Sequence, residues 1–283
     1  MYYWIWLSLL TFLTPIQKIE LLKKYEKPEK LYNIVKEEWL LLNYIDEKVY
    51  AKIEKSKSEE SINKYLKAIK KENINVITIL DKEYPYKLKE IYDPPVVLYT
   101  IGDVNLLNSK SIGIVGSRDC SLYGKNVTIY FSRKLASNEI TVVSGLAKGI
   151  DLYAHIGCLQ AKGRTIAVLG NGINVIYPKE NSTIYSEIIK RGGLLVSEYI
   201  INATPVPLNF PARNRIISGL SDKLLVVESK EKTGTISTVD FALDYGKDIY
   251  VVPGNIDNKY SEGTNNLIKQ GASIVTGIRD IIN

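Results

Sequence analysis

The chain has 283 residues, 45% of them hydrophobic and 24% charged, which is enough for a folded core in one large or two modest domains. Two cysteines exclude a disulfide framework, and a single histidine excludes a His-rich metal site and disfavours a Ser-His-Asp triad. The net charge is +6, and every arginine follows residue 108, so the second part of the chain holds the side chains best suited to bidentate phosphate contacts.

The N-terminal segment, Met1 to Leu13, is an apolar run that ends at Thr14-Pro15. It is too short to span a bilayer and lacks the basic start of a signal peptide, so we expect a buried first helix, no membrane association and a cytoplasmic protein. Over residues 1–70 apolar side chains recur at helical spacing, which predicts a helical N-terminal domain. The polar stretch Ser56 to Glu60 is typical of a loop within it.

We interpret residues 71–110 as a connecting segment. Residues 75–80 and 95–99 are rich in β-branched side chains, which predicts two short strands that join the sheet domain. Between them, Asp81 to Pro95 carries three prolines, and we expect it to be extended.

From residue 111 to 283 the pattern alternates between apolar runs and helical stretches such as Lys125 to Asn138. Continuous β-branched runs separated by helices are typical of a mostly parallel α/β sheet with helices on both faces. The predicted strands are 111–116, 140–144, 164–169, 193–197, 223–228, 248–252 and 273–276.

Several of these strands end in glycine- or serine-rich turns, as in Gly116-Ser117-Arg118 and in Ser144 to Gly149. In a parallel sheet all such turns meet at the carboxyl edge, where glycine lets the backbone approach a ligand and helix-start amides attract anions. Each turn alone could be purely structural, but together they predict a phosphate-binding rim. Its basic residues are Arg118, Lys148, Lys179, Arg213, Arg215 and Lys232.

The segment 209–221 adds an aromatic ring to this rim. Phe210, Arg213, Asn214 and Arg215 surround a proline just before an apolar run that predicts a helix. A ring for stacking next to two guanidinium groups suits a nucleic-acid strand. The alternative is a loop whose arginines pair with nearby carboxylates.

The common nucleotide and catalytic motifs are missing. The first predicted strand is not followed by G-x-G-x-x-G, and the sequence contains no P-loop and no G-x-S-x-G elbow. His155 follows Asp151 by one helical turn, but a buried histidine packed near the sheet explains it better. Glu198 ends the fourth predicted strand, where we expect it to pair with a rim arginine. We therefore expect no cofactor, no metal and no enzymatic activity.

Four segments together resemble DNA-processing protein A, the DprA/Smf family. They are Ser144 to Asp151, Phe210 to Ser218, Val252-Pro253-Gly254 and Gly263 to Ala272. The resemblance implies an extended Rossmann-like domain over residues 111–283 that binds single-stranded DNA and forms homodimers. It also implies a role in natural transformation, in which the protein protects incoming single strands and loads the RecA recombinase.

Carried over residue by residue, the resemblance implies a pocket in which guanidinium and ammonium groups hold phosphates and Phe210 stacks on a base. Lys247, after the glycine at a helix end, is a further candidate. With the Gly234-Thr235 turn, the full predicted set is Gly116, Ser117, Arg118, Ser144, Gly145, Lys148, Gly149, Lys179, Phe210, Arg213, Asn214, Arg215, Lys232, Gly234, Thr235 and Lys247.

This sequence departs from the family pattern at three places. Leu13 to Gln17 lacks the glycine hairpin that is common between two helices of the N-terminal domain, which puts DNA binding by residues 1–70 in doubt. We expect no winged-helix module after Asn283. Ala212 stands where another basic residue is common, which we expect to weaken affinity.

Two other functions stay open on the sequence alone. Related Rossmann-like enzymes that cleave nucleoside monophosphates carry P-G-G-x-G-T-x-x-E, whereas here Thr233-Gly234-Thr235 lacks the first glycines and Thr238 replaces the glutamate. A nucleotide-sensing domain is the other alternative. Neither alternative accounts for as many of these residues as single-stranded DNA binding does.

Overall fold

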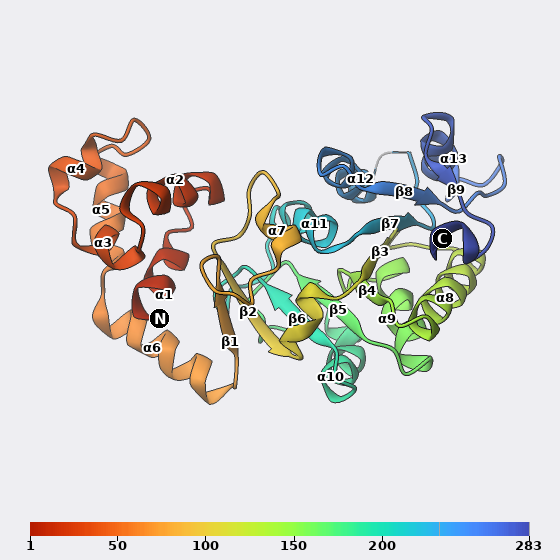
Figure 1. Cartoon of the computed structure of the whole chain (residues 1–283), viewed down its shortest axis with the longest axis horizontal. Helices are drawn as coiled ribbons and strands as arrows, with labels where there is room; N and C mark the ends of the chain where they lie inside the picture. Colours follow the sequence, from red (N-terminus) through yellow and green to blue (C-terminus); the bar gives the residue numbers. More distant parts are fainter. Residues whose placement is uncertain (232, 283) are drawn as a thin grey trace.

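The computed structural model describes residues 1–231 and 233–282. A group of short helices lies beside one large sheet, as predicted for the N-terminal part of the chain (Figure 1). These helices are α1 (Tyr2–Leu9), α2 (Pro15–Tyr25), α3 (Pro28–Asn33), α4 (Lys36–Leu40), α5 (Glu47–Ser56) and α6 (Glu59–Lys71). Within the described residues, no helix has both the length and the apolar character needed to cross a membrane.

Side-chain caps fix where these helices begin. Thr14 and Gln17 form a capping box at the start of α2: the Gln17 amide donates to Thr14 Oγ1 at 3.2 Å, and the Thr14 amide donates to Gln17 Oε1 at 2.9 Å. Ser58 caps α6 in a similar way, so the predicted loop at 56–60 shortens to two residues between α5 and α6.

The sheet contains nine strands in the described part of the chain, in the order β1-β2-β6-β5-β4-β3-β7-β8-β9. The pairs β1/β2 and β2/β6 are antiparallel and all the others are parallel, which confirms the predicted mostly parallel sheet. The strands are β1 (Asn75–Thr78), β2 (Val97–Gly102), β3 (Ser111–Val115), β4 (Thr141–Ser144), β5 (Thr165–Leu169), β6 (Leu194–Ser197), β7 (Lys223–Val226), β8 (Asp248–Val251) and β9 (Ser273–Ile274).

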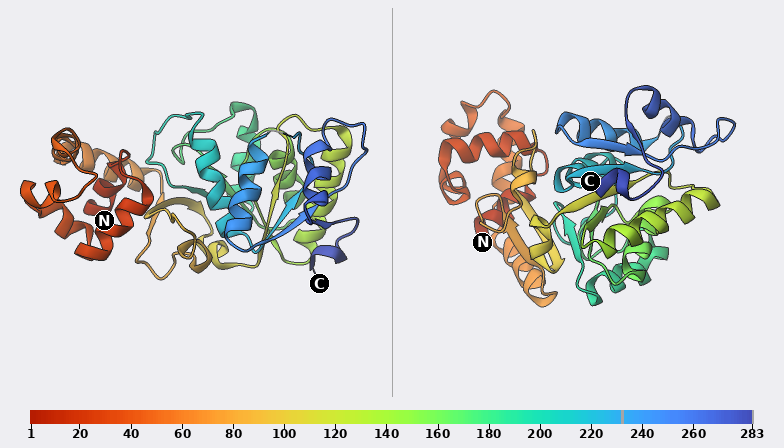
Figure 2. Two further views of the ribbon diagram at one scale, coloured as in Figure 1. Left: turned by 90° about the horizontal axis from the view of Figure 1, so that it is seen from above. Right: turned by 45° about the vertical axis from the view of Figure 1, so that its right-hand side comes forward.

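Helices cover both faces of the sheet (Figure 2). Helices α8 and α9 pack against each other and against β4, while α11 and α12 pack together on the opposite face. The elements that follow the N-terminal helices are α7 (Tyr86–Lys89), the 3-10 turns η1 (Val104–Asn108) and η2 (Lys179–Asn181), α8 (Leu122–Ser137), α9 (Ile150–Gln160), α10 (Ser182–Lys190), α11 (Asn209–Leu220), α12 (Gly234–Asp244), α13 (Glu262–Lys269) and α14 (Arg279–Ile282).

Strand β3 shows why its sequence is apolar throughout. Ile112 and Ile114 belong to a buried cluster with Phe131 of α8 and Cys158 of α9. Val115, whose side chain points to the opposite face, belongs to the larger cluster that contains α11 and α12 side chains. Both faces of the strand are therefore covered, as its continuous apolar run predicts.

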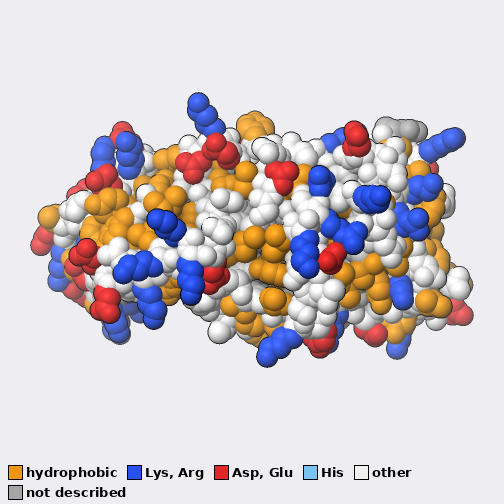
Figure 3. Space-filling view, turned by 90° about the horizontal axis from the view of Figure 1, so that it is seen from below, with side chains coloured by type: hydrophobic (Ala, Val, Ile, Leu, Met, Phe, Trp, Pro, Cys, Tyr) orange, Lys and Arg blue, Asp and Glu red, His pale blue; other side chains and the backbone are white. Residues whose placement is uncertain are grey.

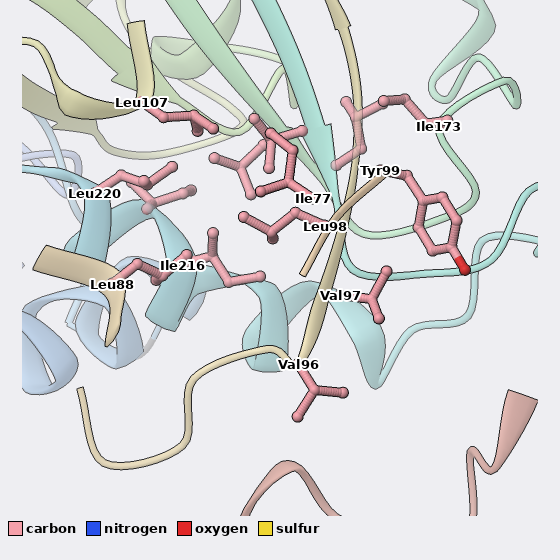
Figure 4. Packing of buried hydrophobic residues seen from close by; sticks show 14 of the residues in the cluster. Ile77, Leu88, Val96, Val97, Leu98, Tyr99, Leu107, Ile173, Ile216 and Leu220 are labelled. Atoms are coloured by element: carbon pink, nitrogen blue, oxygen red, sulfur yellow. The ribbon is translucent and has the colours of Figure 1, made fainter. Parts of the chain in front are cut away.

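The larger buried cluster also joins the N-terminal helices to the sheet. Leu98 of β2 points toward Ile216 of α11, whereas Val97 points to the other side of the strand (Figure 4). The Tyr99 hydroxyl is 2.7 Å from Ser8 Oγ of α1, so β2 carries contacts to both parts of the chain.

The segment between β1 and β2 is less extended than predicted. It contains the short helix α7, and the Tyr84 hydroxyl donates to the Pro95 carbonyl at 2.7 Å, which closes the segment into a loop. Leu88 of α7 is fully buried, and its side chain faces α11 in the same cluster (Figure 4). Burial of Leu88 favours this helical turn, whereas the three prolines of the segment predicted an extended chain.

Candidate nucleic-acid interface

The chain reverses its direction across the sheet at β3. From β3 it moves strand by strand to β6 on one side, and β7 then returns to pair with β3 on the other side. Helix α8 follows β3 on one face, and α12 follows β7 on the opposite face. The loops after β3 and β7 therefore diverge, which opens a crevice at the carboxyl edge, the usual ligand position in such sheets.

The loop after β3 is held close to β7. The Ser117 amide donates to the Glu228 carbonyl at 2.8 Å, and Ser117 Oγ donates to the Asp119 carbonyl at 2.7 Å. A Cβ added at Gly116 would lie 2.8 Å from the Glu228 carbonyl oxygen, so only glycine fits there. Gly116 and Ser117 thus shape the loop, and the Arg118 side chain is exposed beyond them.

The loop after β4 is built just as tightly. Gly149 has φ +74°, and a Cβ on it would lie 2.3 Å from the Ser117 carbonyl oxygen. Ser144 is fully buried and donates through Oγ to the Ile114 carbonyl at 2.7 Å. The structure does not bring Ser144 to the site: its hydroxyl bonds to the neighbouring strand, and it lines neither of the cavities described below, so its predicted DNA contact stays a prediction.

Arg213 is a buried cation behind this loop, with only 3% of its surface exposed. Its Nη1 donates to the Gly145 carbonyl at 2.7 Å and to the Val168 carbonyl, and its Nε donates to Asn214 Oδ1 at 3.2 Å. Burial lowers the pKa of Arg213 to about 10, and the nearby Asp151 carboxylate opposes that shift. A Cβ at Gly145 would lie 2.5 Å from the guanidinium, so this glycine makes room for it.

An aromatic and cationic stack stands in front of Arg213. The Arg118 guanidinium lies 5.6 Å from the centre of the Phe210 ring. Phe210 lies 5.5 Å from the ring of Tyr177, with the two planes tilted by 32°. Tyr177 was not among the predicted site residues, although its place beside Pro178 and Lys179 in the turn after β5 was a usable signal. We call these two adjacent rings and the cation over one of them the platform; such a surface has the chemistry on which unpaired bases stack.

Two exposed lysines, Lys148 and Lys179, come from the loops that follow β4 and β5. Lys148 pairs with Glu180 at 2.8 Å, and both side chains are exposed, so the pair contributes little to stability. In the half of the molecule that holds the sheet, Lys and Arg side chains gather around a hydrophobic patch on the face shown in Figure 3.

Two cavities flank the platform. The larger, of about 330 Å³, includes Ser117, Arg118, Asn214, Gly234 and Thr235 in its lining. The smaller, of about 90 Å³, is lined by aromatic and apolar side chains together with Gly145, Lys148 and Asn171. Four residues line both cavities: Arg118, Ala147, Phe210 and Arg213. Most residues of the full predicted set therefore line one or both of the cavities around Arg213 and Phe210.

Arg215 does not belong to this group. It is 3% exposed, and both its terminal nitrogens donate to the Glu198 carboxylate at 2.7 Å while Nε lies 2.9 Å from Asp93 Oδ2. Burial acts to lower the pKa of Arg215, but Glu198 and Asp93 outweigh it and raise that pKa above its ordinary value. The guanidinium of Arg215 is occupied by two carboxylates, so the structure does not bring it to the platform, and its predicted contact to a DNA phosphate stays a prediction. The expected pairing of Glu198 with an arginine is confirmed.

Two other predicted cations are not part of the platform. Lys247 directly precedes β8 and so lies at the amino ends of the parallel strands, where it lines a separate cavity with Tyr86 and Tyr245. Its assignment to the pocket is therefore wrong, because a position before a strand lies at the opposite edge from a position after one. Lys232 lies outside the described residues.

The candidate acid–base groups face away from the rim. His155 is fully buried, its Nδ1 lies 2.8 Å from Thr165 Oγ1, and burial lowers its pKa to about 3, so the imidazole is neutral. Neither His155 nor Glu198 lines either cavity at the platform. Among the described residues, no cluster of three His, Cys, Asp or Glu side chains has the arrangement of a metal site.

These features define a class of protein: a Rossmann-like α/β sheet with a basic and aromatic platform at its carboxyl edge. The family model described as DNA recombination-mediator protein A matches residues 75–283, from the first residue of β1 onward. DNA processing protein DprA of Bacillus subtilis is 42% identical over 217 residues, which cover 76% of this chain and 73% of that protein. Protein Smf of Escherichia coli is 41% identical over 223 residues, 79% of this chain and 60% of that protein.

Solved structures agree with the sequence relatives. DNA processing protein A from Streptococcus pneumoniae superimposes with a TM-score of 0.88 at 34% identity, covering 100% of this chain and 97% of that one. DNA processing protein A from Helicobacter pylori, solved to describe its single-stranded DNA binding mode, has a TM-score of 0.66 at 32% identity and covers 74% of this chain and 94% of that one. The chain belongs to the DNA recombination-mediator protein A family.

Proposed function

We propose that this protein binds single-stranded DNA at the platform formed by Arg118, Phe210 and Tyr177. The main supporting observation is that this stack lies beside the buried cation Arg213 and is flanked by two cavities. A ring beside a guanidinium stacks any unpaired base, and lysines at its edge hold the backbone, so binding is insensitive to sequence and weakened by salt. The relative from H. pylori, described by its single-stranded DNA binding mode, supports this assignment.

Within this proposal the protein acts by holding a strand and performs no reaction on it. Phosphodiester chemistry needs a metal ion or an activated acid–base pair near the strand. The side chains at the platform are instead cations, rings, hydroxyls and amides, and the two carboxylates in its larger cavity are engaged, Asp151 by the Gly145 amide and Asp119 by Lys230.

The proposed role in the cell is recombination mediation in the cytoplasm. The protein protects incoming single strands during natural transformation and loads the RecA recombinase onto them, as a homodimer joined through the Rossmann-like domain. Membership of the recombination-mediator family supports this role. The test is RecA filament formation on a single strand with and without the protein, beside its mass by light scattering. A monomer that leaves RecA unaffected would contradict the role while leaving strand binding intact.

Arg118→Ala tests the proposed binding site. We expect it to weaken binding of labelled oligo(dT) by roughly 1 to 3 kcal/mol, because it removes a charge-assisted phosphate contact and the cation over Phe210. Arg118 is exposed, so the thermal midpoint should stay unchanged. Arg133→Ala, an exposed arginine on α8, is the matched control. Equal affinity in wild type and the Arg118 variant would refute the assigned platform.

A further inference from the structure

The cavity of about 330 Å³ lies at the point where the chain reverses across the sheet. It is lined on one side by the loop that follows β3, residues 116–119, and on the other by the first turns of α12. Neighbouring strands β3 and β7 align there, with Val115 opposite Val226. This crevice is separate from the aromatic cavity under Tyr177, although the two share a wall.

Two hydroxyl groups of α12 reach this cavity. Thr235 and Thr238 are 6% and 2% exposed, both line the cavity, and they stand one helical turn apart on the same face of α12. Within the described parts of the chain, neither Oγ1 has a hydrogen-bond partner. Some other buried threonines donate to a backbone carbonyl: Thr128 donates to the Gly124 carbonyl at 2.6 Å and Thr165 to the Val142 carbonyl at 2.7 Å. Both hydroxyls are therefore available to hydrogen-bond a polar group placed in the cavity.

The charged side chains of the cavity indicate the charge of such a group. Arg118, Arg213 and Lys230 line it together with two carboxylates: Asp119, paired with Lys230 at 3.1 Å, and Asp151, which accepts from the Gly145 amide at 3.1 Å. Among the described residues, the cations of the lining therefore outnumber its carboxylates, three to two. The amides of the first turn of α12 add positive potential. Thr233, at the N-cap, makes no side-chain cap for this helix and instead places its hydroxyl 2.9 Å from Ser229 Oγ. An anionic group with hydroxyl or ether oxygens beside it fits this lining.

The shared wall connects this ligand to the stacked base. Arg118, Ala147, Phe210 and Arg213 border both cavities. Groups bound in the two cavities are therefore separated only by these side chains. The smaller cavity adds Leu169, Tyr177 and Pro178, which suit the flat face of a base. One cavity is thus built for sugar and phosphate, and its neighbour is built for a base.

We infer that the α12 cavity binds the sugar and phosphate of the nucleotide next to the one whose base stacks on Phe210 and Tyr177. This inference rests on the proposed single-strand binding and deepens it. The strand bends over Arg118, with a phosphate between the two arginines and the neighbouring sugar against the Thr235 and Thr238 hydroxyls. A duplex cannot make this bend without unpairing, because the stacked base must leave its partner.

The test removes the two hydroxyls without changing their volume. Thr235→Val with Thr238→Val should weaken fluorescein-labelled oligo(dT) binding on the order of tenfold, because two hydrogen bonds to the strand are lost. Thr100→Val is the matched control: it removes a buried hydroxyl that has no partner among the described residues, and it lies in β2, away from both cavities. Thermal midpoints of all three proteins establish that they are folded.

A second variant blocks the same cavity by volume. Gly234 lines it, and a Cβ there meets no described atom within 4 Å, so Gly234→Leu fills open space without displacing the protein's own groups. Gly277→Leu, at a glycine equally free of neighbours, is its control. We expect Gly234→Leu to weaken oligo(dT) binding several-fold and Gly277→Leu to leave it unchanged.

The outcomes separate this inference from the proposed function. If wild type does not bind oligo(dT), the proposed function itself fails. If wild type binds but the double variant and Gly234→Leu bind equally well, the α12 cavity is overturned and the platform stands. If the variants lose only free dTMP, tested as a competitor, and keep their affinity for oligo(dT), the cavity holds a free nucleotide, and the inference is likewise overturned.

Discussion

Arg213 and Arg215 stand two residues apart in α11 and are equally buried, yet their partners differ in charge. Arg213 donates to neutral carbonyl oxygens, so it keeps its positive charge for a ligand in the cavities that it lines. Arg215 is neutralised by Glu198 and Asp93, so it ties α11 to the end of β6 and to the loop before β2. Arg213 thus supplies a cation to the candidate site, whereas Arg215 stabilises the fold.

Arg215→Ala separates these roles. We expect it to lower the free energy of unfolding by roughly 3 to 5 kcal/mol, because it leaves two partly buried carboxylates without their cation. Urea unfolding measures this, with Arg133→Ala as the exposed control that should change stability by less than about 1 kcal/mol. A fully stable Arg215→Ala protein with weakened DNA binding would show that the original assignment of Arg215 to the DNA site was right.

At the scale of elements, the predictable features were those that depend on neighbours in sequence. The strands of the sheet follow from β-branched runs, and the N-terminal helices follow from apolar side chains at helical spacing. The features that local sequence could not determine involve partners far apart in the chain. Glu198 and Asp93 lie 17 and 122 residues from Arg215. Ser144 bonds across to a neighbouring strand, and Tyr177 reaches Phe210 only in the folded sheet.

The contact between α2 and the sheet contains an unusual lysine. Lys18 is 9% exposed and lines a small cavity with Pro95, Val97 and Glu198. It has no ion pair within 4.0 Å among the described residues, and burial lowers its pKa to about 8 despite the attraction of Glu198. This charge therefore opposes the packing of α2 against the sheet at neutral pH.

Lys18→Met should stabilise the protein by roughly 1 to 3 kcal/mol at pH 7, since it keeps the apolar stem and removes the buried charge. The folded pKa of Lys18 is lowered, so the unfolded chain binds the extra proton between about pH 8 and 10.5. The cost of Lys18 is thus complete below pH 8 and disappears as the pH rises through that window. Urea unfolding of both proteins at pH 7 and pH 10 measures the difference. A stability gain that does not shrink with pH would contradict this account.

At the scale of the whole molecule, the sheet begins earlier than residue 111. Strands β1 and β2 complete one edge of it, and Asp93, which precedes β2, pairs with Arg215. The division into residues 1–70, 71–110 and 111–283 stays a prediction. The loop before β2 carries part of the buried ion network, so we expect the connecting segment to be needed for the sheet to fold.

Two truncations test this division. Removing residues 1–72 leaves every strand in place, and we expect a folded protein that still binds oligo(dT), as the platform lies wholly beyond residue 110. Removing residues 1–105 takes away β1, β2 and Asp93, and should abolish cooperative unfolding because β6 loses its antiparallel neighbour β2 and Arg215 loses a carboxylate. Circular dichroism melts beside binding titrations distinguish the two. A folded, DNA-binding 106–283 fragment would contradict this role for the connecting segment.

The central claim is that the carboxyl edge of the sheet holds an unpaired strand by stacking and phosphate contacts. The most direct measurement is fluorescence anisotropy of labelled oligo(dT), titrated at low and moderate salt, with unlabelled duplex as competitor. The account predicts tight binding that weakens as salt rises and that duplex does not displace. Absence of binding to oligo(dT), with free nucleotide bound instead, would contradict it.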